Sequence, residues 1–234
     1  MRSVRDEARR AGLLYLLIVA TAWVGLIYVP SAVLVSGNAA ETAERIRASE
    51  SIIRAGIASE LFHQIVQIYL VLSLYRLFRA TDPSRARSLV VLGALVSVPI
   101  VFVNVLNEFA ALRLAGNTPF LAALPRSEAD ALAYLFMSLH SQGVRVAAVF
   151  WGMWLLPFGS LAIRSGFIPK IFGYLLLVAG GSYLADEFAA LIVPPAAGVV
   201  SSVAGLLELA ELPIVLWLAI RGARGPGAEA AAAP

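Results

Sequence analysis

The stretch LVVLGALVSVPIVFVNVLNEFAAL (residues 89–112) decides the fold class. Its one charged side chain is Glu108, and its amide side chains are those of Asn104 and Asn107. As a helix it would rise about 36 Å at about 1.5 Å per residue. That length is enough to cross a bilayer core of about 30 Å. The stretch therefore predicts a transmembrane helix.

Five more apolar stretches of similar length lie before and after this one. The chain of 234 residues is 60% hydrophobic and 14% charged, whereas soluble domains average about 25% charged residues. We therefore expect an all-α, six-helix transmembrane bundle forming a single membrane domain over residues 1–224. The predicted spans are about 11–35, 52–78, 89–112, 140–163, 168–193 and 198–220. Residues 225–234, rich in Ala, Gly and Pro, predict a disordered tail.

Basic residues between the spans predict the orientation of the bundle. Twelve of them fall on the side of the two termini and five on the opposite side, and the richer side is normally cytoplasmic. We therefore predict an inner-membrane protein with both termini in the cytoplasm. An amphipathic segment at about 127–139 would then extend outside the cytoplasm before the fourth span. The expected partner is the lipid bilayer and not nucleic acid, despite a pI near 9.5.

The predicted spans carry many polar side chains. On the second span Glu60, His63, Gln64 and Gln67 follow the spacing i, i+3, i+4, i+7, which is one face of a helix. In the predicted topology such faces meet in the outer half of the membrane, with those of the sixth span near its middle. The residues expected to bind a small polar ligand or a cation there are Glu60, His63, Gln67, Asn104, Asn107, Glu108, His140, Gln142, Arg145, Glu208 and Glu211.

Charge makes this polar face costly. A charged side chain at mid-bilayer costs about 2.5–3.5 kcal/mol on insertion scales, so protonation, water or bound cations must compensate the carboxylates. The leading hypothesis is therefore binding or translocation of a small polar solute, an ion or a proton through an outward-half polar cavity. A structural interpretation stays open beside it, because polar side chains also hold membrane helices together by hydrogen bonds.

Two other classes of function stay open. One is a membrane-embedded enzyme that uses carboxylates and His140, with or without a metal. Glu60-x-x-His63 has the spacing of di-iron carboxylate sites, but Met137 stands where a second such pair would need a glutamate. The metal candidates are therefore Glu60, His63, His140 and Glu211, with no metal, cofactor or catalytic residue assigned. The other class is a structural or accessory subunit of a membrane complex.

Several short motifs give the chain a family resemblance. They are Ala58-Ser59-Glu60-Leu61, Asn104-x-x-Asn107-Glu108, Leu139-His140-x-Gln142-Gly143, Phe150-Trp151-Gly152-x-Trp154-Leu155-x-Pro157-Phe158-Gly159 and Glu208-Leu209-x-Glu211-Leu212-Pro213-Ile214. With these motifs the chain resembles the bacterial membrane family DUF4386 over nearly its whole length. The resemblance implies a multi-pass membrane protein and brings no activity with it.

Overall fold

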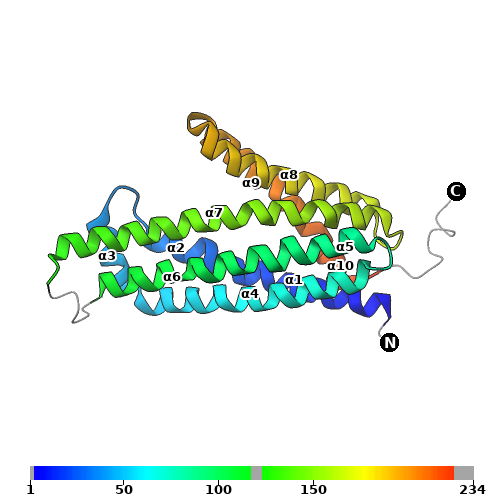
Figure 1. Cartoon of the computed structure of the whole chain (residues 1–234), viewed down its shortest axis with the longest axis horizontal. Coiled ribbons are helices and arrows are strands. Elements are labelled where there is room, and N and C mark those ends of the chain that lie inside the picture. Colours follow the sequence, from blue (N-terminus) through cyan, green and yellow to red (C-terminus); the bar gives the residue numbers. More distant parts are fainter. Residues whose placement is uncertain (1–2, 117–122, 224–234) are drawn as a thin grey trace. The chain divides into compact units, whose positions relative to one another are not determined.

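The computed structural model describes residues 3–116 and 123–223, which are helical almost throughout (Figure 1). Six helices in this part of the chain are long and apolar enough to cross a membrane. They are Val4–Val33, Glu50–Phe78, Pro83–Ala115, Arg126–Arg164, Lys170–Ile192 and Pro194–Ile220. The prediction of an all-α, multi-pass membrane protein is confirmed. The predicted tail, residues 225–234, lies outside the described residues.

Three of the six spans change their helical pitch along their length. The first consists of α1 (Val4–Ala22), the π-helix η1 (Trp23–Tyr28) and α2 (Val29–Val33). The third consists of α5 (Pro83–Val90), the π-helix η2 (Val91–Val96) and α6 (Ser97–Ala115). The sixth consists of α9 (Pro194–Glu208), the 3-10 turn η4 (Leu209–Glu211) and α10 (Leu212–Ile220). The other spans are α4 (Glu50–Phe78), α7 (Arg126–Arg164) and α8 (Lys170–Ile192), and α3 (Ala39–Ala48) is short.

Capping side chains fix where two of the helices begin. The Asn38 side chain accepts from the backbone N–H of Glu41 at the start of α3. Asp82 accepts from the backbone N–H groups of Ser84 and Arg85, so that the third span begins at Pro83, earlier than the predicted residue 89. The backbone hydrogen bond from Arg85, followed by that residue's side-chain bond, lowers the pKa of Asp82. These are typical N-cap interactions, which satisfy backbone donors that a helix start leaves free.

The fourth span is longer than a bilayer requires. The sequence predicted a helix that opens at Ser127, with amphipathic first turns to about residue 139 and a spanning part at about 140–163. In the structure, α7 is one continuous helix of 39 residues. No glycine or proline interrupts the sequence between Arg126 and Gly143, so nothing ends the helix where the apolar span begins.

Large apolar side chains are exposed along the spans, as expected where lipid replaces water. Val103 is 66% exposed, Leu206 is 72% exposed and Leu191 is 76% exposed. A soluble protein would have to cover such surfaces. In a bilayer they are the faces that contact acyl chains.

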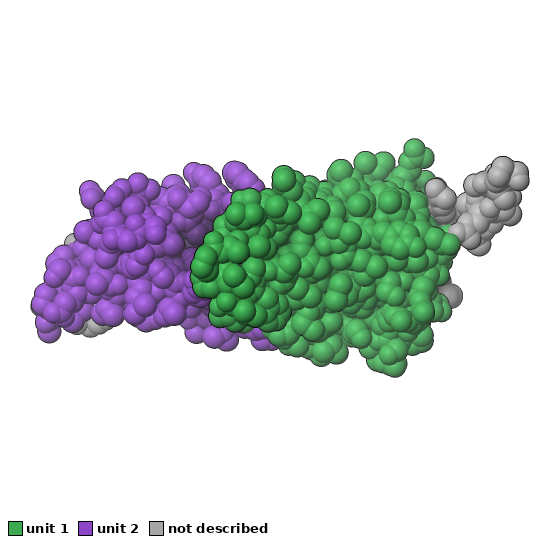
Figure 2. Space-filling view, turned by 90° about the horizontal axis from the view of Figure 1, so that it is seen from above, with its two compact units in different colours: residues 1–17, 66–98, 146–234 green, residues 18–65, 99–145 purple. Residues whose placement is uncertain are grey.

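The described helices group into two compact units, coloured separately in Figure 2. Unit 1 comprises residues 1–17, 66–98 and 146–234, and unit 2 comprises residues 18–65 and 99–145. Unit 1 contains an aromatic core in which Trp154 lies 5.8 Å from Tyr15 and 5.7 Å from Phe158, between ring centroids. It also contains the hairpin of α8 and α9, which run side by side (Figure 1).

Unit 2 has its own apolar core and carries the polar residues of greatest interest. The buried core residues come from α2, α3, α4, α6 and α7 and are Val29, Val33, Ala43, Ile46, Ile53, Ile57, Val105, Ala111, Ala115, Ala133 and Met137. An ion pair ties α3 to α7, with Arg47 Nη1 at 2.8 Å from Asp130 Oδ1. This core holds the first half of α4 against α6 and α7.

Candidate functional site

Three ionisable side chains from three different helices meet inside unit 2. Glu60 comes from α4, Glu108 from α6 and His140 from α7, and each is fully buried. His140 Nε2 lies 3.2 Å from Glu60 Oε2 and 3.9 Å from Glu108 Oε2. One ligand atom from each residue lies within 4.8 Å of the other two. We refer to these three residues as the carboxylate–histidine cluster.

The cluster leaves much of its hydrogen-bonding capacity unused. Among the described residues no hydrogen-bond partner exists for Glu60 Oε1, for either carboxylate oxygen of Glu108, or for His140 Nδ1. The Gln64 side chain, one turn after Glu60 on α4, is also buried and has no partner for its oxygen or its nitrogen. A buried polar group without a partner costs about 1–3 kcal/mol, and more when it is charged. The cluster is therefore suited to take up a further group.

The formal charge of the cluster points to a positively charged partner. With both glutamates ionised, the cluster carries −2 when His140 is neutral and −1 when His140 is protonated. An uncompensated buried charge costs several kcal/mol. Addition of protons or of a metal cation brings the sum to zero, whereas an anionic ligand would increase the imbalance.

Two glycines allow the first span to approach Glu60. A Cβ at Gly25, within η1, would lie 2.6 Å from Cγ of Glu60, and a Cβ at Gly56 would lie 2.8 Å from a methyl group of Val29. Small residues let membrane helices come this close. A π-helix such as η1 is itself frequent at functional sites. The first span, whose sequence has no polar face, therefore still helps to shape the site.

Amide side chains and a third glycine position His140. Asn104 donates from Nδ2 to the backbone carbonyl of His140 at 2.9 Å, and Asn107 donates to Asn104 Oδ1 at 3.0 Å. A Cβ added at Gly143, one turn after His140, would overlap the Asn104 side chain and lie 2.8 Å from its Nδ2. The glycine leaves room for an amide that fixes the turn of α7 bearing His140.

Other residues predicted for the site have different neighbours. His63 Nδ1 lies 3.1 Å from Thr21 Oγ1, and Gln67, in unit 1, donates to the carbonyl of Gly93 in η2 at 3.0 Å. Gln142 is exposed on α7 and Arg145 is half-buried.

The predicted residues of the sixth span lie in unit 1. Glu208 is the last residue of α9 and Glu211 ends the 3-10 turn η4. Their membership of one cavity with Glu60 stays a prediction. The structure brings Glu60, Glu108 and His140 within reach of one metal ion. Glu108 was not a sequence-based metal candidate, and two of those candidates, His63 and Glu211, are not in this group.

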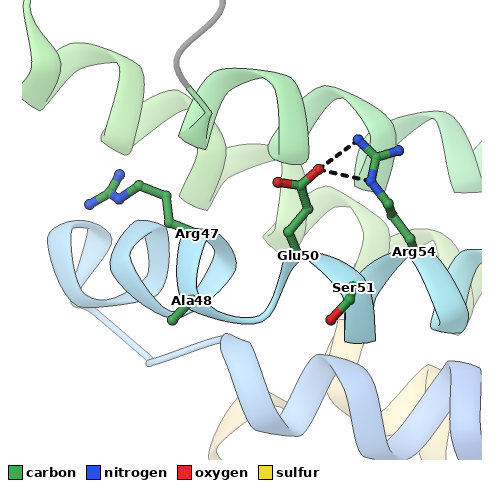
Figure 3. A pocket seen from close by; sticks show the side chains of 5 residues that line it. All are labelled: Arg47, Ala48, Glu50, Ser51 and Arg54. Carbon is green, nitrogen blue, oxygen red and sulfur yellow. Dashed lines mark hydrogen bonds and ion pairs between the residues drawn. The ribbon is translucent and has the colours of Figure 1, made fainter.

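A surface depression lies where α3 meets α4 (Figure 3), and no residue of the cluster lines it. Its lining residues are Arg47, Ala48, Glu50, Ser51 and Arg54. Arg54 is paired with Glu50 at 2.7 Å, as drawn in Figure 3, and Arg47 is paired with Asp130. Both cations are already neutralised, so this depression is a weaker candidate for a binding site than the buried cluster.

A comparison with protein families matches the model "Domain of unknown function (DUF4386)" to residues 10–222. The chain therefore belongs to this family, as its motifs indicated. No curated protein and no solved structure matches the chain.

Proposed function

Starting from a family without an assigned activity, we propose that this multi-pass membrane protein binds a cation, either a proton or a metal ion, inside the membrane. The proposed site is the carboxylate–histidine cluster. The observation that carries the proposal is the pair of fully buried carboxyl groups, three of whose four oxygens have no hydrogen-bond partner among the described residues. Ionisable groups within spans often mark ion pathways and proton relays.

Comparison within the same protein argues against a purely structural role for the cluster. Gln67 and Asn104 hold helices together through paired hydrogen bonds, to the carbonyl of Gly93 and to the carbonyl of His140. Glu108 has no hydrogen-bond partner for either oxygen among the residues described. Side chains that only joined helices would be expected to use their hydrogen bonds.

The placement of the three residues suggests how binding is used. Each comes from a different span, so a bound cation attracts three helices at once, and its release leaves like charges facing one another. A ligand shifts a conformational equilibrium by its difference in affinity between the states. We propose that the protein uses this difference in affinity to bind or translocate a small polar solute, an ion or a proton. We also propose that it lies in the inner membrane with both termini in the cytoplasm.

The test uses the full chain, purified without a tag and treated with a chelator. Infrared spectra should show the carbonyl band of a protonated carboxyl group, or a thermal-shift series should show stabilisation by a cation. Glu60→Gln and Glu108→Gln should remove that response, because an amide has no charge to neutralise. Glu44→Gln, at an exposed position of α3, is the matched control and should keep it. If wild type shows neither response, the proposed function is wrong.

A further inference from the structure

We propose that the carboxylate–histidine cluster binds one divalent transition-metal ion, with Glu60, Glu108 and His140 as its protein ligands. The inference rests on the proposed function, since it names the cation that the cluster takes. The three side chains are fully buried, come from three helices and offer one ligand atom each within 4.8 Å of the others.

Charge selects a divalent ion. Two carboxylates and a neutral imidazole together carry −2, so one divalent cation makes the site neutral, whereas a sodium or potassium ion leaves −1. The difference is large in a buried site, where an unbalanced charge costs several kcal/mol. Proton binding could also balance the cluster, and the experiment below separates the two cases.

The spacing of the ligand atoms suits a metal ion with tetrahedral coordination. Zinc is bound by His nitrogen and carboxylate oxygen at about 2.0–2.2 Å, which places two tetrahedral ligand atoms about 3.4 Å apart. His140 Nε2 lies 3.2 Å from Glu60 Oε2 and 3.9 Å from Glu108 Oε2, so the two distances bracket that value. Small side-chain rotations would suffice to close the site around the metal.

The kinds of ligand narrow the choice further. Magnesium and calcium prefer oxygen ligands and larger or water-rich shells, whereas an imidazole nitrogen with carboxylates suits zinc, iron or manganese. Three protein ligands leave a coordination position for water or for another donor. Gln64 supplies an uncommitted, buried amide oxygen one turn beyond Glu60.

The surroundings of His140 set the expected affinity. In most metal sites the second imidazole nitrogen donates to an acceptor, and loss of that partner weakens binding about 10–100-fold. His140 Nδ1 has no hydrogen-bond partner in the described part of the chain. We therefore expect an exchangeable ion that a chelator removes, unlike the ion of a structural zinc site.

The experiment measures binding directly. Tag-free full-length protein in detergent is stripped with a chelator and titrated separately with zinc, manganese, magnesium and calcium. The metal-to-protein ratio is measured after desalting, and the melting temperature in parallel. Zinc or manganese should bind at one ion per chain and raise the melting temperature, whereas magnesium and calcium should do neither at equal concentration.

Matched variants assign the ligands. Glu108→Gln and His140→Gln should each weaken binding at least tenfold, whereas Glu44→Gln and His63→Gln should leave it unchanged. His63 and His140 are the two histidines of the chain. X-ray absorption spectra of the zinc-loaded His63→Gln protein should still show imidazole scattering, which tests the site even if His140→Gln fails to fold.

Each outcome separates this inference from the function on which it rests. A protonated-carboxyl band without binding of any divalent ion would overturn the metal site and leave cation binding in place. Metal binding that persists in both Glu108→Gln and His140→Gln would also overturn it. Neither a proton nor a metal response would overturn both proposals.

Discussion

Replacement of Gly143 by alanine tests the contact that positions His140. The added Cβ would lie 2.8 Å from Asn104 Nδ2, well inside the usual contact distance of about 3.5–4.0 Å. Asn104 must then move, and it loses its hydrogen bond to the carbonyl of His140 and the one that it accepts from Asn107. The turn of α7 that bears His140 is released as a result.

The size of the effect follows from three contributions. Overpacking of a tight site costs about 1–3 kcal/mol, and the interhelical hydrogen bond from Asn104 to the carbonyl of His140 contributes about 0.6 kcal/mol. Alanine in a helix recovers up to about 1 kcal/mol relative to glycine. The net expectation for Gly143→Ala is a destabilisation of about 1–3 kcal/mol.

The assay is SDS-driven unfolding in mixed micelles, followed by circular dichroism. Gly181→Ala is the control, because a Cβ at Gly181 meets nothing within 4 Å, and it should be neutral or mildly stabilising. The double variant Gly143→Ala/Asn104→Ala should cost clearly less than the sum of its two single variants, since the overlap disappears. The proposed positioning of His140 would be refuted if the free-energy costs of the two single variants were strictly additive. It would also be refuted if Gly143→Ala destabilised the protein no more than Gly181→Ala does.

Two further predictions concern topology and pH. A reporter active only in the cytoplasm should function when fused after Arg79 or Ser165 and fail after Asn38 or Gly116; activity after Gly116 would contradict the proposed orientation. Hydrogen bonds from the first turn of α5 lower the pKa of Asp82 in the folded protein. The ionised carboxylate therefore stabilises the fold above the unfolded-state pKa of about 3.9. This stabilisation is lost as the pH falls through the lower pKa of the folded state. Melting curves between about pH 2 and 6 should therefore show a steeper acid loss in wild type than in Asp82→Asn, and equal slopes would refute this role.

The sequence predicted six helices long and apolar enough to cross a membrane, and the structure has them, because apolar length alone identifies such helices. Their ends and their internal pitch were harder to predict. The third span begins at Pro83 because Asp82 caps it, a local signal that hydropathy does not register. In the π-helix of Trp23–Tyr28, Gly25 lies close to the Glu60 side chain, a long-range contact that no local pattern contains.

The sequence named the residues of the carboxylate–histidine cluster among a larger set of candidates but did not predict that these three side chains meet. Glu60, Glu108 and His140 were all candidates from their place within apolar spans. Their mutual contact depends on helix rotation, which glycines such as Gly25 and Gly143 set through close approaches. Spacing along one helix also suggested that Glu60 and His63 act together, but the His63 ring lies against Thr21 of the first span.

The 39 residues of α7 give it a length of about 58 Å at about 1.5 Å per residue. A bilayer with its headgroups is about 40–45 Å thick, so an upright α7 would extend more than two turns beyond the headgroups. A chain of 24.9 kDa with so little aqueous mass is difficult to align in electron cryomicroscopy images. A rigid helical fusion partner, joined in register to the N-terminal turns of α7, would act as a fiducial marker. Its fixed orientation would allow particle images of this protein to be aligned in lipid nanodiscs.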